Sequence, residues 1–423
     1  MKTRLWTATA VCALASASAL HAQDITAWVI DGDAEKGYFV QLEEAFNASG
    51  AGFTVDVVPI PGYNDAVNAA TLAGDLPDVI MLDGPNMASM AWAGTVQPIG
   101  GMLDPAILED LLPAIRAQGT YGPTGEFFFI SPYDSSVLLW GNRKLLEAAG
   151  VEIPTTVADA WTADELTEIL TKLDAVEGVE WPLDVKLNYG AGEWMTYGFA
   201  PFVQSAGGDI INRETWVADG TINSDANVKA LTYLKDWVNA GFIVPASGGD
   251  NKFYGEKTAA LSWVGNWQWK AHQEGLGEDL VLIPAPSFGD KGPVSPNGGW
   301  GWAVPTSSKN VDAAKAFLNF AMSSDQVAKY ADMTGYIPAR ASAIPLSKRY
   351  GPGGEGALFA EQASCCAVVR PVHPAYPVIT AAFSQAVVNI LTGTADVKAE
   401  LDAAAKTIDQ DIEDNSGYPP FNE

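Results

Sequence analysis

Basic residues are scarce in this sequence. Its 24 lysine and arginine residues are outnumbered by 51 aspartates and glutamates, which gives a formal net charge of -27 at pH 7. A chain this acidic repels phosphate backbones and anionic lipid surfaces, so we exclude nucleic acids as partners. The acidic residues are scattered rather than grouped in blocks, which argues against a disordered acidic tail.

Cysteine and histidine are rarer still. Beyond residue 22 the chain keeps only Cys365, Cys366, His272 and His373. Two isolated histidines and two adjacent cysteines cannot form an ordinary zinc site, and we expect no cofactor. The adjacent cysteines leave two alternatives, a strained vicinal disulfide or two buried free thiols. An oxidising compartment favours the disulfide, which would add a flat apolar surface if it faced a ligand.

Long apolar runs are missing except near the N-terminus. A short basic start at residues 1–4 precedes an alanine-rich apolar stretch at 5–20. Ala17-Ser18-Ala19 and the Ala22–Gln23 junction both have the small residues of a cleavage site. This is the pattern of a secretory signal peptide, and its apolar part is too short to cross a membrane. We therefore expect residues 1–22 to be removed. The loss of Lys2 and Arg4 would take the net charge from -27 to -29.

The first part of the mature chain alternates between two patterns. Strand-like segments at residues 25–30, 53–58 and 78–82 are separated by helix-like segments at 36–49 and 63–73. This alternation predicts an α/β fold with a parallel sheet and right-handed crossovers. Ligands of such sheets collect at the carboxyl ends of the strands. Asp31 and Asp33 follow the first strand and Asp83 follows the third, so these carboxylates are candidate ligand contacts.

The rest of the chain predicts a second lobe. Thr162 and Glu165 have the spacing of a capping box ahead of an amphipathic helix, and residues 224–240 predict another helix. No long linker separates the two parts. Short joints rich in proline or glycine lie instead near residues 131–132, 284–286 and 338–340. Three short joints indicate two lobes threaded back and forth, which close by hinging.

Two clusters of tryptophan and glycine are the most informative feature. Residues 265–269 read Gly-Asn-Trp-Gln-Trp, and residues 298–302 read Gly-Gly-Trp-Gly-Trp. Indole rings offer flat apolar faces that suit the C–H faces of a sugar ring, and glycine lets a ligand approach closely. The alternative is that the tryptophans belong to the core. Glycine contributes little packing surface to a core, so two glycine-flanked clusters favour a sugar site.

The order of these and other segments resembles one known family, the extracellular solute-binding proteins of the maltose-binding type, which deliver carbohydrates to ATP-binding cassette importers. The resemblance covers essentially the whole mature chain. The segments that carry it are residues 28–33, 36–38, 74–80, 138–146, 265–267, 298–305, 309–310, 334–338 and 370–376. It implies a periplasmic protein with a periplasmic-binding-protein-like fold, in which two α/β lobes joined by a multi-crossing hinge trap the ligand between them. Residues 23–132 and 285–340 would form the N-terminal lobe, and residues 133–284 and 341–423 the C-terminal lobe.

The resemblance also implies a set of ligand-binding residues. Carboxylates would accept sugar hydroxyl protons, tryptophans would stack on sugar rings, backbone N–H groups of glycine would donate to hydroxyls, and an arginine would reach in from the last segment. The candidates are Asp31, Asp33, Asp83, Tyr133, Asp134, Glu193, Trp194, Trp267, Gly298, Gly299, Trp300 and Arg370. Gly84-Pro85-Asn86 follows Asp83 where the maltose binders have a basic residue, which argues against maltodextrin as the ligand.

These observations predict a monomeric binding protein for a mono- or disaccharide, with membrane permease subunits as partners and no enzymatic activity. The alternatives are a binder of a polyamine, a glycerophosphodiester or a sulfonated sugar, and a secreted glycoside hydrolase. A hydrolase would also use tryptophans and paired carboxylates. However, the best carboxylates fall on different predicted lobes, and the sequence has neither a Gly-x-Ser-x-Gly elbow nor a Ser/His/Asp arrangement.

Overall fold

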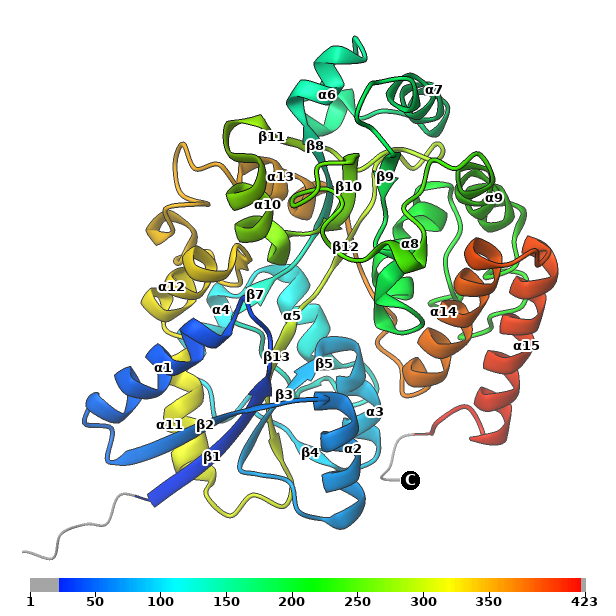
Figure 1. The fold of residues 1–423 in the computed structure, drawn as a ribbon. Helices are drawn as coiled ribbons and strands as arrows, with labels where there is room; N and C mark the ends of the chain where they lie inside the picture. The colour runs from blue at the N-terminus through cyan, green and yellow to red at the C-terminus, as the bar shows by residue number, and fades with distance from the viewer. Residues whose placement is uncertain (1–22, 420–423) are drawn as a thin grey trace, which may run out of the picture.

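The computed structural model describes residues 23–419 and consists of two lobes, each with its own sheet and hydrophobic core (Figure 1). The predicted signal peptide at 1–22 lies outside the described residues. In Figure 1 the lobe that begins with the N-terminal strands lies at the bottom and the other lies at the top. Within residues 23–419, none of the helices has the length and apolar character that a membrane span requires.

The first sheet has five strands in the order β2-β1-β3-β13-β4. They are β1 (Gln23–Ile30), β2 (Phe53–Ile60), β3 (Val79–Asp83), β4 (Val96–Gln97) and β13 (Trp300–Pro305). β1 pairs in parallel with β2 and β3, as the alternation of strands and helices predicted. β13 arrives from much later in the chain and pairs antiparallel with β3 and β4. A sequence-distant strand therefore completes the sheet of the first lobe.

The second sheet has four strands in the order β11-β8-β10-β9. They are β8 (Val137–Asn142), β9 (Trp181–Asp184), β10 (Ala259–Gly265) and β11 (Leu280–Ile283). Every residue of β8 and β10 is buried, which explains why these strands read as continuous apolar runs. A two-stranded hairpin of β5 (Thr120–Tyr121) and β6 (Glu126–Phe127) belongs to the first lobe.

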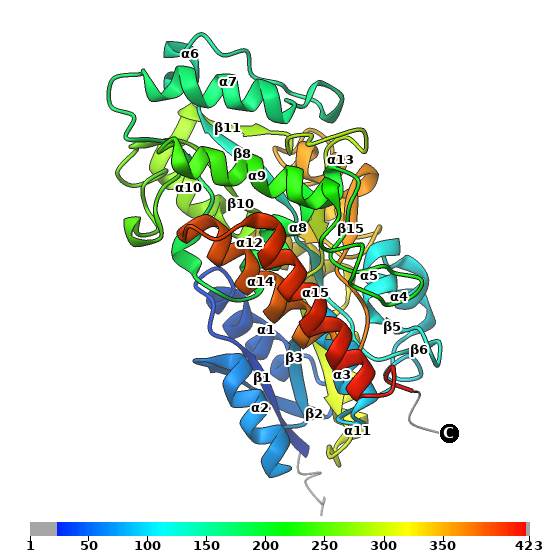
Figure 2. The ribbon, with the colours of Figure 1, turned by 90° about the vertical axis from the view of Figure 1, so that its right-hand side faces the viewer.

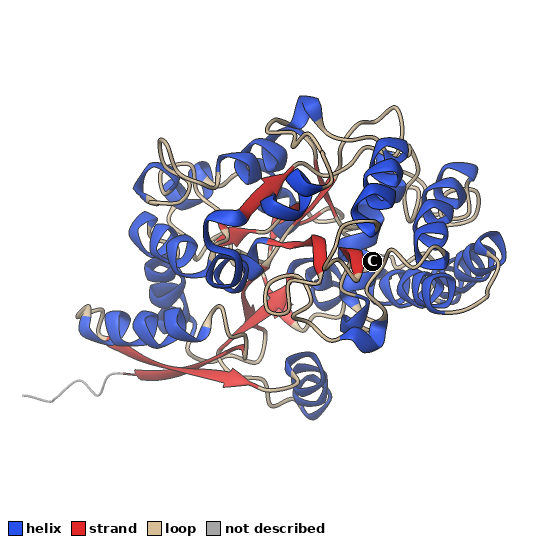
Figure 3. Ribbon diagram, turned by 45° about the horizontal axis from the view of Figure 1, so that its top comes forward, coloured by secondary structure: helices blue, strands red, loops and turns tan. Residues whose placement is uncertain are grey.

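Helices cover both sheets (Figure 3). Those of the first lobe are α1 (Lys36–Ala48), α2 (Tyr63–Ala73), α3 (Met87–Trp92), α4 (Pro105–Asp110), α5 (Pro113–Gly119), α11 (Val311–Ala321) and α12 (Ser324–Thr334). Those of the second are α6 (Arg143–Ala148), α7 (Ala163–Asp174), α8 (Glu193–Ser205), α9 (Asp225–Asn239), α10 (Trp269–Leu276), α13 (Ala357–Cys365), α14 (Tyr376–Thr392) and α15 (Val397–Asp414). The capping box of Thr162 and Glu165 is present at the start of α7, as predicted.

Two separate clusters of buried apolar side chains form the cores. Tyr133 packs in the first cluster, whereas Ala285 and Phe288 pack in the second. Trp302 lies in the first cluster again. We therefore propose that the chain crosses between lobes just after Tyr133 and again between Phe288 and Trp302, rather than at residues 132 and 285.

Two short strand pairs hold the lobes together at the crossings. β7 (Tyr133–Asp134) pairs antiparallel with β14 (Ile337–Pro338), and β12 (Ser295–Asn297) pairs in parallel with β15 (Ala367–Val369). β7, β12 and β14 belong to passages of the chain between the lobes, whereas β15 lies between α13 and α14 of the second lobe. Because they are hydrogen-bonded to one another, these passages form one compact hinge.

The C-terminal end adds a contact between the lobes. Figure 2 shows α15 running down from the second lobe towards α3 of the first. The indole N–H of Trp92, at the end of α3, donates to the backbone carbonyl of Pro419 at 2.8 Å, and its ring meets that of Tyr418 edge-on at 4.9 Å.

The sulfurs of Cys365 and Cys366 are bonded to each other at the end of α13. Cys365 is exposed and Cys366 is partly exposed. Neither residue lines the cavity described below.

Candidate functional site

A cavity of about 300 Å³ lies where the two lobes meet the hinge. Both lobes and the hinge contribute to its walls, which are rich in aromatic side chains. Its lining residues are Asp83, Tyr133, Ser135, Tyr189, Glu193, Trp194, Tyr197, Trp267, Gly298, Gly299, Trp300, Tyr336 and Arg370. Nine of the twelve residues predicted from the sequence are therefore brought together around one space.

The first lobe contributes a carboxylate and an indole from neighbouring strands. Asp83 ends β3 and Trp300 begins β13, and the two residues stand opposite each other in the antiparallel pair. The Trp300 ring meets the ring of Tyr63 edge-on at 5.5 Å. The Tyr63 hydroxyl bonds to the backbone of Trp28 and Met81. Tyr63 is thus fixed to two strands and holds the indole at the cavity wall.

The second lobe contributes residues from the start of α8 and the end of β10. Glu193, Trp194 and Tyr197 fall on the first turns of α8, and Trp267 follows β10. The rings of Trp194 and Trp267 meet edge-on at 5.9 Å. A Cβ at Gly265 would lie 1.9 Å from the Trp267 ring. Glycine is therefore required because the indole folds back over the end of the strand.

Arg370 joins the two lobes across the cavity. Its guanidinium donates to both carboxylate oxygens of Asp83, at 2.8 and 2.6 Å, and to Glu193 at 2.6 Å. It also lies 4.8 Å from the centre of the Tyr197 ring. Arg370 follows β15, so the hinge positions it between a carboxylate of the first lobe and one of the second. A bidentate pair of this kind fixes direction as well as distance.

Burial and neighbouring charges shift the pKa values of Glu193 and Arg370 in this bridge. Burial raises the pKa of Glu193, while Arg370 and the hydroxyl of Tyr376 act in the opposite direction. Burial also disfavours the charged form of Arg370, but Asp83 and Glu193 outweigh it, so the pKa of the guanidinium is raised. Two carboxylates and one guanidinium leave an excess of negative charge at the cavity when all three are ionised.

The hinge glycines accommodate protein groups. A Cβ at Gly299 would lie 2.5 Å from the Tyr133 ring, and the Tyr133 hydroxyl accepts the backbone N–H of Trp300 at 2.9 Å. Gly298 has a φ of 125°, and its N–H donates to Asp134 at 2.8 Å. The prediction that the Gly298 N–H donates to a ligand is wrong for this conformation, because Asp134 already accepts that bond.

Three predicted carboxylates lie outside the cavity. Asp31 and Asp33 both contact the ammonium group of Lys36, and Asp33 is fully exposed. They follow β1, whereas the cavity is built on β3 and β13. Asp134 is buried at the hinge, where it binds the Gly298 N–H and the side-chain amide of Asn297. Burial raises the pKa of Asp134 to about 7, and it holds β7 to the segment before β13.

The sequence reasoning missed Ser135, Tyr189, Tyr197 and Tyr336. Tyr197 is four residues after Glu193 and so lies on the same helical face, which the spacing could have revealed. Tyr336 stacks on Tyr133 with ring centres 4.0 Å apart and donates to the buried Glu35 at 2.7 Å. Burial raises the pKa of Glu35. This buried carboxylate, two residues after Asp33, faces the interior that Asp33 was expected to reach.

Comparison with known proteins places the chain in a family. Residues 41–350 match the family described as bacterial extracellular solute-binding protein. The chain belongs to this family. Among its relatives is the arabinooligosaccharide-binding protein of Bacillus subtilis, which is 24% identical over 335 residues, covering 75% of this chain and 73% of the relative. Another is the maltooligosaccharide ABC transporter solute-binding lipoprotein of Streptococcus pneumoniae, 22% identical over 331 residues, covering 76% of this chain and 73% of that relative.

Solved structures share the two-lobed fold of this solute-binding protein. Maltose-bound MalE3 of T. maritima has a TM-score of 0.80 at 20% identity, covering 92% of this chain and 100% of that one. UgpB from Mycobacterium tuberculosis, in complex with glycerophosphocholine, has a TM-score of 0.78 at 18% identity, covering 93% of this chain and 100% of that one. At these identities the likeness shows the fold alone.

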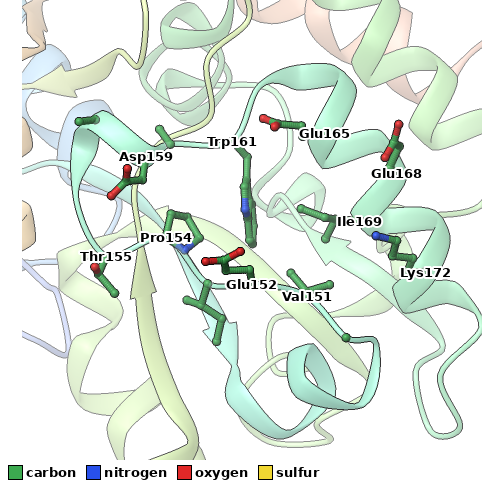
Figure 4. A pocket seen from close by; sticks show the side chains of 14 residues that line it. Val151, Glu152, Pro154, Thr155, Asp159, Trp161, Glu165, Glu168, Ile169 and Lys172 are labelled. Carbon is green, nitrogen blue, oxygen red and sulfur yellow. The ribbon is translucent and has the colours of Figure 1, made fainter.

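A larger hollow of about 700 Å³ lies at the far end of the second lobe of this solute-binding protein. Figure 4 shows its rim, which comes entirely from residues 150–172. The acidic side chains at this rim are exposed, namely Glu152, Asp159, Glu165 and Glu168. No described residue of the other lobe or the hinge lines this hollow, so closure of the lobes does not enclose a ligand there.

Proposed function

We propose that this solute-binding protein captures a mono- or disaccharide in the cavity between its lobes and presents the closed complex to the membrane subunits of an ATP-binding cassette importer. It acts in the periplasm as a monomer and performs no chemical reaction on its ligand. The observation that carries this proposal is one cavity lined by aromatic rings from both lobes, with two carboxylates held in place by a single arginine.

The chemistry of the cavity supports a sugar. The faces of Trp194, Trp267 and Trp300 match the apolar faces of a pyranose. Asp83 and Glu193 accept hydrogen bonds from sugar hydroxyls, and charge-assisted hydrogen bonds of this kind are the stronger ones. A volume of about 300 Å³ is at the lower end for small-molecule sites, which favours one or two rings.

The arrangement of the lobes supports a capture mechanism. Asp83 and Trp300 belong to one lobe and Glu193 and Trp267 to the other, so a ligand contacts all four only when the lobes are closed. Ligand binding then shifts the equilibrium towards the closed form, which an importer can distinguish from the open one. The relative named as an arabinooligosaccharide-binding protein supports the carbohydrate class.

The alternatives fit less well. Arg370 is the sole cationic residue at the cavity within the described part of the chain, and Asp83 and Glu193 already bind it. A phosphodiester or sulfonate therefore lacks a free cation, despite the likeness to a fold that holds glycerophosphocholine. A polyamine is the second candidate, because the excess carboxylate and the aromatic rings both attract cations.

A thermal-shift panel tests the proposal. Neutral mono- and disaccharides, phosphodiesters and polyamines are each added in large excess to the mature protein. A ligand at a hundred times its Kd stabilises the folded state by about 2.7 kcal/mol, which raises Tm by several degrees. We expect this shift from a neutral sugar. A shift from polyamines or phosphodiesters alone would contradict the proposal, as would turnover of nitrophenyl glycosides.

A further inference from the structure

The cavity described above is called the aromatic cavity from here on. A second space lies beside it, and Asp83 and Glu193 stand between the two. It has a volume of about 370 Å³ and shares Asp83, Glu193 and Trp300 with the aromatic cavity. Both lobes line it. α2, β3 and α3 contribute from the first lobe, and Pro377 and Thr380 of α14 contribute from the second. We call this space the amide compartment, because three asparagines line it: Asn64, Asn68 and Asn86.

The three asparagines come from two segments that meet at the compartment. Asn64 and Asn68 are one turn apart on α2, which places them on one face of that helix. Asn86 ends η1 (Gly84–Asn86), the short turn that follows β3. Across residues 23–419 no hydrogen bond, ion pair or ring contact engages these three side-chain amides. Each amide therefore has both donors and an acceptor available to a ligand.

The charged groups that line the compartment limit the class of ligand that can bind there. Among residues 23–419, no lysine, arginine or histidine lines it, and its two carboxylates are those that Arg370 already binds. Amides without an accompanying cation suit hydroxyl groups, which both donate and accept hydrogen bonds. Anionic groups would meet Asp83 and Glu193 with no cation to balance them.

Trp300 connects the two spaces. Trp300 lines both spaces, and the edge-on contact with the Tyr63 ring fixes the orientation of its indole. A rigid aromatic face that borders two compartments suits the junction between two linked rings. A ligand lying along this indole would place one ring among the aromatic side chains and the next among the amides.

We propose that the amide compartment is a second saccharide subsite, so that the preferred ligand has at least two rings, one on each side of Trp300. The inference rests on the proposed function, and it selects the disaccharide over the monosaccharide. The hydroxyls of the second ring exchange hydrogen bonds with Asn64, Asn68 and Asn86. The aromatic cavity holds the first ring independently of these three residues.

Calorimetric titration of the mature protein with matched sugars tests this subsite. The probes are glucose with maltose, arabinose with arabinobiose, and galactose with melibiose. The variant is Asn64→Ala/Asn68→Ala, whose two positions are exposed on α2, so the fold is retained. The matched control is Leu72→Ala, one turn further along the same face, 91% exposed and outside the compartment.

We expect at least one disaccharide to bind the wild type about tenfold more tightly than its monosaccharide. The double variant should weaken that disaccharide about tenfold and leave the monosaccharide within twofold, while Leu72→Ala changes neither. Equal effects on both sugars, or no effect on the disaccharide, would overturn the second subsite alone. Failure of the wild type to bind any of the sugars would overturn the proposed function and this inference with it.

Discussion

The hollow at the far end of the second lobe and the cavity between the lobes differ in volume and in how the chain builds them. The hollow at residues 150–172 has more than twice the volume of the cavity between the lobes. One continuous stretch of chain builds it, and its charged groups face solvent. The smaller cavity collects Asp83, Glu193 and Arg370 from three distant segments and holds them among aromatic rings. We therefore place the proposed ligand site where distant segments converge rather than where the volume is greatest.

Their carboxylates behave in opposite ways. Glu165, at the acidic rim, accepts from the backbone N–H and hydroxyl of Thr162, and these bonds lower its pKa. Burial instead raises the pKa of Glu193 in the cavity and of Asp134 behind it. The rim acid caps a helix. The buried acids are kept at an energetic cost that the structure offsets with Arg370 and backbone donors.

The largest expected effect comes from breaking the bridge in the cavity. Arg370→Met leaves the buried Asp83 and the partly exposed Glu193 without a cation. Removal of one partner of a buried pair costs about 3–5 kcal/mol. Urea unfolding should show this loss in the free energy of unfolding. Arg370→Lys is the control. It keeps the charge but not the bidentate geometry, so its loss should be smaller. Equal stability of the Met variant and the wild type would show that the bridge is not a structural element.

The pH dependence of stability should differ in sign between Asp134 and Glu165. The pKa of Asp134 rises from 3.8 to about 7 on folding. The folded state therefore binds more protons than the unfolded state between these values, and this contribution to stability is lost as pH rises from about 4 to about 7. From pH 5 to pH 8, the wild type should lose about 2–3 kcal/mol relative to Asp134→Asn in urea unfolding.

The matched control for that experiment is Glu165→Gln. The pKa of Glu165 is lowered by folding, so its contribution is present above the unfolded pKa and is lost in acid. The wild type should therefore gain stability relative to this variant as pH rises through the acidic range. The stability difference between the wild type and each variant should change with pH in opposite directions for Asp134→Asn and Glu165→Gln. A change in the same direction for both variants would contradict this prediction.

A pair of tryptophan substitutions separates binding from packing. Trp267 lines the cavity, and Trp161 is buried beside the acidic hollow. Trp267→Ala should weaken sugar binding by about 2 kcal/mol, or roughly thirtyfold, as expected for a stacking tryptophan. Trp161→Ala should lower stability by about 3–5 kcal/mol and leave the Kd within twofold. Calorimetry and urea unfolding on both variants give the two quantities. A weaker Kd for Trp161→Ala would implicate the larger hollow.

The smallest expected effect is at the acidic rim itself. Glu152→Gln/Glu168→Gln removes two exposed charges. The stability should change by less than about 0.5 kcal/mol, as is usual for surface substitutions, and the Kd for sugar should stay within twofold. A loss of sugar binding in this double variant would move the site to the far end of the second lobe.

Local patterns predicted most of the fold. The strands and helices of residues 23–83 lie close to the predicted ranges, because their apolar periodicity matches the faces that become buried. The place of β13 between β3 and β4 was not predicted. Nothing in residues 300–305 indicates a partner more than 200 residues earlier in the chain.

The residues of the candidate site were harder to predict from the sequence than the fold, because they too depend on the pairing of distant strands. Asp31 directly follows β1 and Asp83 ends β3 of the same sheet, so strand position alone cannot separate them. Only the pairing of β3 with β13 brings Asp83 next to Trp300 and within reach of Arg370. The tryptophan and glycine clusters predicted segments that line the cavity between the lobes. The glycines of these clusters make room for Trp267 and Tyr133 rather than for a ligand.

The late arrival of β13 has a consequence during synthesis. Until Pro305 has been made, β3 lacks its neighbour on one side and β4 is detached, so the first lobe cannot complete its sheet although four of its strands already exist. A nascent or truncated chain that stops earlier exposes unpaired strand edges, which invite association with other chains. The folded state is thus reached only after roughly three quarters of the polypeptide has emerged.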